Sequence, residues 1–144
     1  MRGMWVAAAV ASLGTGAWAA TPAPKPPVGR VVLPPLSYTV DRAGPAGGAH
    51  PTRRDTIVVN YTLTLLDGTV VDSSVARGEP ATFPLDRLIP AWQVLVQLMR
   101  PGDAWTFYVP PEYGYGATAR EKLPANSFLV FKVELVSTTP PAAQ

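Results

Sequence analysis

The sequence predicts an α+β fold, in which about five antiparallel strands form one sheet and a single helix lies across its concave face. Two kinds of periodicity carry this prediction. Residues 56–66 and 104–109 alternate apolar and polar side chains, which is typical of strands with one buried face. Residues 88–99 instead place apolar side chains three and four positions apart, which is the period of an amphipathic helix. No other segment has a convincing helical period, so this helix is expected at the centre of the fold.

The predicted helix has recognisable ends. Pro90 suits the first turn, because its fixed backbone angle is already helical and its missing N–H would have no partner there. Arg100, Pro101 and Gly102 end the helix. Its first turn should place Trp92 at the mouth of whatever the sheet encloses. The apolar face is expected to hold residues 88, 91, 92, 94, 95, 98 and 99.

The remaining elements are predicted to be short strands joined by turns. Asp67 and Gly68 are a typical two-residue hairpin turn. A long loop at residues 110–127 is typical of a functional segment, because such loops are uncommon in compact domains. Strands are expected, in chain order, at residues 36–40, 56–66, 69–73, 81–83, 104–109 and 127–136.

The first twenty residues have the features of a signal peptide. Arg2 precedes an apolar run, and small residues follow up to Ala19 and Ala20, either of which fits a cleavage site. The apolar run is shorter than the ~20 residues of a spanning helix, which disfavours the alternative of an uncleaved membrane anchor. The protein is therefore expected to be exported, to a periplasm or to the medium, without stable membrane insertion after cleavage.

Three further segments are expected after residue 20. Residues 21–35 form a Pro-rich linker, for which a role as ligand of a proline-binding partner is the less favoured alternative. Residues 36–136 form the folded domain, and residues 137–144 a disordered tail.

Composition argues against several classes of function. The chain has no cysteine, which excludes disulfides, thiolate metal sites and a thiol nucleophile. Its single histidine, His50, lies in a Gly-rich loop, so histidine triads and multi-histidine metal sites are not expected. The formal net charge is +2 and the cations are scattered, so no nucleic-acid partner is expected. We expect a function that needs no metal and no cofactor.

Few side chains remain that could carry chemistry. Asp72 is followed by two serines, and its simplest role is to accept hydrogen bonds from their N–H groups in a turn. Tyr115 lies between Gly114 and Gly116, where a ring is poorly explained as core filler and the glycines permit unusual backbone angles. The aromatic residues of different elements either fill a core or converge on an apolar pocket suited to an uncharged ligand or peptide.

Several blocks of the sequence together point to a known family. They occur in this order at residues 58–62, 66–74, 88–92, 113–116, 123–127 and 129–135. Over residues 36–136 the chain resembles the FKBP-type peptidyl-prolyl cis-trans isomerases, and in its exported form the small periplasmic or Mip-like bacterial members. The resemblance implies a strongly curved sheet wrapped around one short central α-helix.

The resemblance also implies roles for single residues. Trp92 would form the floor under a proline ring, while the Ile89 N–H and the Tyr115 hydroxyl would each hold a substrate carbonyl. Asp72 would point toward the bound amide, as a positioning group. The implied catalytic residues are Asp72, Ile89 and Tyr115, and the implied substrate-binding residues are Tyr61, Val71, Phe83, Leu88, Ile89, Trp92, Tyr115, Leu123 and Phe131.

The expected activity is rotation of Xaa-Pro bonds in exported proteins, by binding of the twisted amide. The expected partners are proline-containing segments of unfolded or exported proteins, together with rapamycin-type macrolide inhibitors. A second hypothesis is a noncatalytic peptide-binding chaperone that uses the same pocket. Val71, where the family usually has phenylalanine, and Ala81, where many members have a second aromatic, favour it. A third is a structural domain whose aromatic core is filled.

Overall fold

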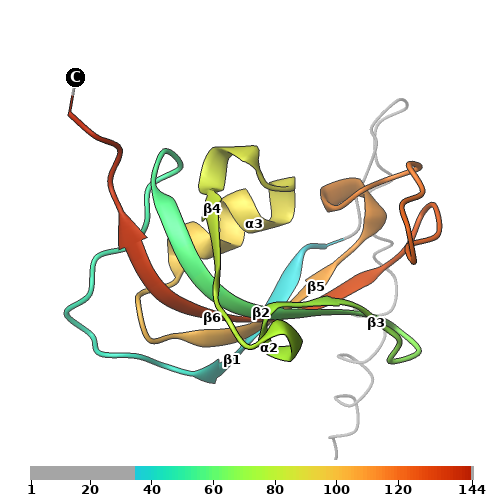
Figure 1. Ribbon diagram of the computed structural model, residues 1–144, viewed down its shortest axis with the longest axis horizontal. Coiled ribbons are helices and arrows are strands. Elements are labelled where there is room, and N and C mark those ends of the chain that lie inside the picture. The colour runs from blue at the N-terminus through green and yellow to red at the C-terminus, as the bar shows by residue number, and fades with distance from the viewer. Residues whose placement is uncertain (1–34, 144) are drawn as a thin grey trace, which may run out of the picture. The chain divides into compact units, whose positions relative to one another are not determined.

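The computed structural model describes residues 35–143 of the 144-residue chain, so the predicted signal peptide and nearly all of the predicted linker lie outside the described residues. The described part forms one antiparallel sheet that curves around a short helix (Figure 1). Its strand order is β1-β5-β6-β2-β3, and β4 pairs with β2 outside this path. The strands are β1 (Ser37–Arg42), β2 (Thr56–Leu65), β3 (Val70–Ser73), β4 (Ala81–Pro84), β5 (Ala104–Val109) and β6 (Leu129–Thr139).

The central strands β2 and β6 confirm the alternation predicted from the sequence. In β2, the odd-numbered apolar residues from Ile57 to Leu63 are buried and face the helix side of the sheet. They pair with the similarly buried apolar residues of β6, for example Leu63 with Phe131 and Tyr61 with Val133. Because each strand buries only one face, the sheet supplies one wall of the core and the helix closes it.

The central helix is shorter than predicted. The α-helix α3 (Pro90–Leu95) continues as the 3₁₀ turn η3 (Val96–Leu98), and Pro90 occupies its first turn as expected. A 3₁₀ helix has three residues per turn rather than 3.6, so residues 96–98 point in other directions than they would in a continued α-helix. Val94 and Leu98 were both expected on the buried face, but they are 53% and 47% exposed. Leu98 lies in the 3₁₀ turn, whereas Val94 lies in α3, about 200° around the helix from the buried Trp92.

The last strand runs past the predicted end of the domain. β6 extends to Thr139, where Ser137, Thr138 and Thr139 pair with Val58, Ile57 and Thr56 of β2. Residues 137–139 are thus not part of a disordered tail. They are polar, so their sequence gives no apolar alternation, and only pairing with a partner strand reveals them.

A one-turn helix after β3 was not predicted. This helix, α2 (Ser74–Arg77), begins at the cap Ser73, whose hydroxyl accepts a hydrogen bond from the Ala76 N–H at 3.1 Å. It ends at Gly78, which has a positive φ of 80°. No helix among residues 35–143 is long and apolar enough to cross a membrane.

Candidate active site

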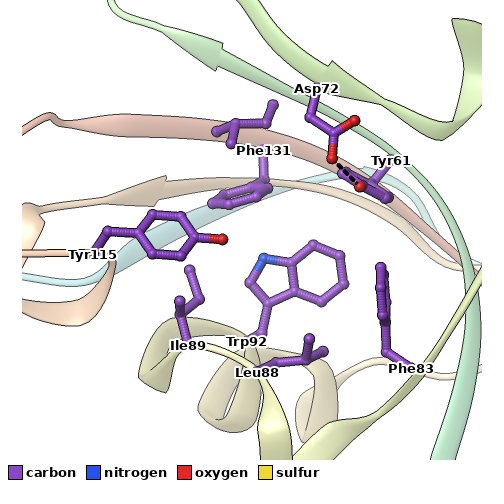
Figure 2. Close-up of a pocket in the computed structure, with 9 residues that line it drawn as sticks. Tyr61, Asp72, Phe83, Leu88, Ile89, Trp92, Tyr115 and Phe131 are labelled. Carbon is purple, nitrogen blue, oxygen red and sulfur yellow. Dashed lines mark hydrogen bonds between the residues drawn. The ribbon is translucent and has the colours of Figure 1, made fainter. Parts of the chain in front are cut away.

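An apolar cavity of about 210 Å³ opens between the concave face of the sheet and the first turn of α3. Figure 2 shows side chains from the sheet, the helix and the loop after β5 pointing into it. The presence of this cavity excludes the hypothesis of a filled aromatic core. It is lined by Tyr61, Leu63, Asp72, Phe83, Leu88, Ile89, Trp92, Tyr115 and Phe131.

Trp92 forms the floor of the cavity. Its indole is 3% exposed and lies near the centre of an aromatic cluster (Figure 2). The ring centroids of Phe131 and Tyr61 lie 5.4 and 5.8 Å from that of Trp92, with interplanar angles of 83° and 88°. Phe83 and Phe107 make further edge contacts with the same ring. Such edge-to-face pairs fix the orientation of the indole, because the positive edge of one ring meets the negative face of another.

The rim of the cavity on the helix side carries a free backbone donor. Ile89 caps α3 at its N-terminus, and its carbonyl accepts hydrogen bonds from the Trp92 and Gln93 N–H groups at 3.0 and 3.2 Å. Within residues 35–143, no hydrogen bond uses the N–H of Ile89. The Gln93 side chain donates to the Leu88 carbonyl at 2.7 Å, which holds the rim segment in place. The Ile89 N–H is therefore a fixed donor without a partner.

Tyr115 closes the side of the cavity that lies opposite Phe83 (Figure 2). Its hydroxyl points toward the space above Trp92 (Figure 2) and makes no hydrogen bond within residues 35–143. The flanking glycines allow this placement. Gly116 has a φ of 57°, and a Cβ on Gly114 would lie 3.0 Å from the Leu129 side chain. The loop thus presents a second donor without a partner.

Among the described residues that line the cavity, Asp72 is the only one with a carboxylate, and both of its oxygens accept hydrogen bonds. Tyr61 donates its hydroxyl to one carboxylate oxygen, and Arg77 of α2 donates to the other. Arg77 also donates to the Tyr61 hydroxyl at 3.4 Å, so the three side chains form a closed network. Asp72 additionally accepts the Ser73 N–H at 2.9 Å, as the turn pattern predicted.

This network sets the protonation of the wall. Burial raises the pKa of Asp72, but hydrogen bonds from Tyr61 and Arg77 outweigh burial, so the pKa lies below its ordinary value of 3.8. Burial and the bond to Asp72 raise the pKa of Tyr61 above its ordinary value of 10.0. Asp72 is therefore a carboxylate and Tyr61 a neutral phenol at neutral pH. A carboxylate held in this state is a poor general acid, which fits a positioning role.

The structure brings together eight of the predicted site residues and leaves two out. Val71 is the unpaired residue of a bulge, between the pairs Leu63 with Asp72 and Thr64 with Val70, and packs against the core. Leu123 is 3% exposed and belongs to the core cluster rather than the cavity lining.

Two contributors to the site were missed by sequence reasoning. Leu63 lines the cavity, although its alternation in β2 indicated only a core residue. Arg77 reaches Asp72 because the single turn of α2 folds the chain back between them. The cap pattern Ser73 to Gly78 is the signal that could have predicted this turn. Among residues 35–143, no group of three or more histidine, cysteine, aspartate or glutamate side chains is placed to hold a metal ion.

Comparison with known proteins agrees with this geometry. The model of a family described as FKBP-type peptidyl-prolyl cis-trans isomerase matches residues 47–136, which is more than half of the chain. The chain belongs to this family. The FKBP-type peptidyl-prolyl cis-trans isomerase FkpA of Aeromonas hydrophila is 49% identical over 108 residues, which cover 75% of this chain and 40% of that protein. The peptidyl-prolyl cis-trans isomerase Mip of Coxiella burnetii is 47% identical over 103 residues, covering 71% of this chain and 44% of that protein.

Solved structures of the family have the same fold. The crystal structure of FkpA from Escherichia coli superposes with a TM-score of 0.69 at 43% sequence identity, covering 73% of this chain and 48% of that one. The crystal structure of AtFKBP13 superposes with a TM-score of 0.64 at 26% identity, covering 72% of this chain and 93% of that one. The chain therefore spans less than half the length of the two curated relatives named above, and the shared part is the FKBP domain.

Proposed function

We propose that this chain is a peptidyl-prolyl cis-trans isomerase that binds the proline ring above Trp92 and accelerates rotation about the preceding peptide bond. The observation that carries the proposal is the pairing of an apolar aromatic floor with two donors that lack partners within residues 35–143. These donors are the Ile89 N–H and the Tyr115 hydroxyl. A proline ring has no N–H and suits an apolar floor, while the carbonyls beside it need donors.

The reaction requires only preferential binding. Rotation about a peptide C–N bond meets a barrier of ~18–20 kcal/mol, because twisting breaks amide resonance. A site lowers the barrier when it binds the twisted amide more tightly than the planar one, and each tenfold gain in rate needs ~1.4 kcal/mol. Twisting reduces charge separation in the amide, so an apolar cavity disfavours the twisted state less than it disfavours the planar state.

Each site residue has a role in this proposal. Trp92, Phe83, Leu88 and Phe131 hold the ring. The Ile89 N–H and the Tyr115 hydroxyl take the carbonyls that flank the rotating bond and keep the peptide in a turn-like shape. Asp72, held by Tyr61 and Arg77, presents a fixed carboxylate to the amide without exchanging a proton with it.

The proposal extends to partners and location. Substrates would be proline-containing segments of unfolded exported proteins, and rapamycin-type macrolides would compete for the cavity. Export is supported by the signal-like first twenty residues and by similarity to a protein named outer membrane protein MIP of Legionella longbeachae, which is 43% identical over 111 residues.

A protease-coupled assay on a Leu-Pro tetrapeptide tests the activity. The wild-type chain should accelerate release of the cis fraction, and Tyr115→Phe combined with Trp92→Leu should abolish the acceleration. Binding of the peptide without acceleration by the wild type would support the noncatalytic chaperone instead. Equal acceleration by the double variant would show that the activity does not arise in this cavity.

A further inference from the structure

The Arg120 side chain stacks on Tyr115, whose ring borders the cavity. The Arg120 guanidinium carbon is 4.4 Å from the centroid of the Tyr115 ring, the same ring whose hydroxyl enters the cavity. A guanidinium over an aromatic face is attracted by the ring quadrupole and loses part of its conformational freedom. Arg120 is exposed, so its N–H groups remain available to a bound peptide.

The backbone holds Arg120 in this position. Arg120 and Leu123 exchange two hydrogen bonds, of 2.8 and 2.9 Å, which close a tight turn around Glu121 and Lys122. Leu123 is 3% exposed, so the turn is anchored in the core. Lys122 adopts a φ of 63°, a left-handed conformation that few residues other than glycine and asparagine favour. The guanidinium is thus presented by a fixed turn rather than by a loose loop.

No carboxylate of the described residues forms an ion pair with Arg120. Among residues 35–143 the ion pairs are Arg42 with Glu134 and Arg77 with Asp72, so no carboxylate lies within 4.0 Å of Arg120. The carboxylate of the cavity wall, Asp72, is already neutralised by Arg77. Glu121 and Lys122 of the same turn are both exposed and offset each other. Glu112, also exposed in this loop, forms no ion pair with Arg120, so the guanidinium has no carboxylate partner although the four charges of the loop sum to zero.

We infer that Arg120 makes this site favour substrates with an acidic side chain directly beside proline. A peptide whose carbonyl reaches the Tyr115 hydroxyl passes along the ring on which Arg120 is stacked. An aspartate or glutamate at that point would meet a pre-positioned guanidinium, whose planar donors match a carboxylate. The inference rests on the proposed function, because it assumes that proline occupies the cavity above Trp92.

The test compares glutamate with glutamine at each position beside proline, since the two differ in charge and little in shape. Exchange NMR on the peptides Ala-Glu-Pro-Ala and Ala-Pro-Glu-Ala, and on their glutamine counterparts, gives the isomerisation rate and the Kd with the full chain. The wild type should prefer glutamate by about two- to five-fold at one of the two positions, the range of an exposed ion pair. The preference should shrink in ~1 M salt, where the screening length is about 3 Å.

Matched variants distinguish an effect of the Arg120 guanidinium from an effect of the overall charge of the loop. Arg120→Gln should abolish the glutamate preference and Arg120→Lys should restore part of it. Lys122→Asn removes an equal charge two residues away, in a residue type that tolerates positive φ, and should keep the wild-type ratio. Each ratio is taken within one variant, so a change in stability cancels.

Two outcomes overturn the inference. One is an equal rate and Kd for glutamate and glutamine in the wild type at both positions, and the other is a preference that survives Arg120→Gln. Acceleration of the glutamine peptides by the wild type tests the proposed function separately. If the chain binds these peptides without accelerating them, the Kd ratio still decides whether Arg120 selects acidic residues.

Discussion

Trp92 and Tyr115 border the same cavity but differ in how the fold depends on them. Trp92 is buried and contacts four other aromatic rings, so Trp92→Ala should lower the free energy of unfolding by about 3–5 kcal/mol and abolish isomerisation. Urea denaturation and the protease-coupled assay measure the two effects.

Tyr115→Phe is the matched variant, because it removes only a hydroxyl that makes no hydrogen bond within residues 35–143. It should leave the free energy of unfolding within about 0.5 kcal/mol, as for substitutions that break no contact. It should lower kcat/KM by about two- to ten-fold, the value of one hydrogen bond. A Tyr115→Phe variant as unstable as Trp92→Ala would contradict the separation of fold and site.

Because the pKa of Asp72 is lowered in the fold, the free energy of unfolding should decrease as the pH falls. Its folded pKa lies below the ordinary value of 3.8, so its ionised form stabilises the fold above that pH and the stabilisation is lost as the pH falls through the folded pKa. The variant Asp72→Asn cannot titrate. The difference in free energy of unfolding between wild type and variant should therefore be constant from pH 5 to 7 and decrease below about pH 3.8.

Urea denaturation at several pH values checks this prediction. The ionised network is partly exposed, with 43% of the Asp72 side chain accessible, so the difference should stay small. If the difference in free energy of unfolding instead grew as the pH fell, the pKa of Asp72 in the folded state would lie above its ordinary value, which would contradict this prediction. Activity should be flat between pH 5.5 and 8, because Asp72 keeps its charge and Tyr61 its proton there.

At the scale of elements, the polar end of β6 is the least obvious support of the fold. Thr138 donates to the Asp55 carboxylate at 3.0 Å, and Asp55 is 5% exposed. Ending the chain after Val136 should lower the free energy of unfolding by about 1–3 kcal/mol, because a buried carboxylate loses a donor and three strand pairs are lost.

A chain that ends after Thr139 provides the control for this truncation. It keeps the strand pairs and the bond to Asp55, so thermal unfolding should resemble that of the whole chain. If both truncated chains were equally stable, residues 137–139 would not support the fold.

The same elements explain what sequence could and could not predict. Strands β2 and β5 and the start of α3 were predicted well, because alternation, hairpin turns and Pro90 act locally. The exposure of Val94 was mispredicted because the expected apolar face was too broad for an α-helix. That of Leu98 was mispredicted because the change to 3₁₀ geometry depends on packing rather than on local pattern. The polar end of β6 was missed for the related reason that pairing is nonlocal.

For the site, eight of the ten residues that the resemblance implied border the cavity, and their roles in binding and catalysis stay predictions. Val71 was expected in the lining, but it is the unpaired residue of a bulge and does not border the cavity. Arg77 and Leu63 were missed because a strand pattern does not reveal which core residue borders a void, or which cation folds back onto Asp72.

At the scale of the whole molecule, the fold joins its core and its site in one element. The buried side of α3 packs on the sheet, while its first turn supplies the cavity floor and the free Ile89 donor. The loop after β5 brings Tyr115 to the same side of the cavity as Ile89 (Figure 2).

An NMR titration of the ¹⁵N-labelled chain with a Leu-Pro peptide tests the central claim most directly, with the Leu-Ala peptide as control. The Ile89 amide proton should move downfield on forming its hydrogen bond, and the Trp92 indole signal should shift, with the proline peptide only. Unchanged Ile89 and Trp92 signals while the peptide binds elsewhere, or equal shifts with the alanine peptide, would contradict a proline site in this cavity.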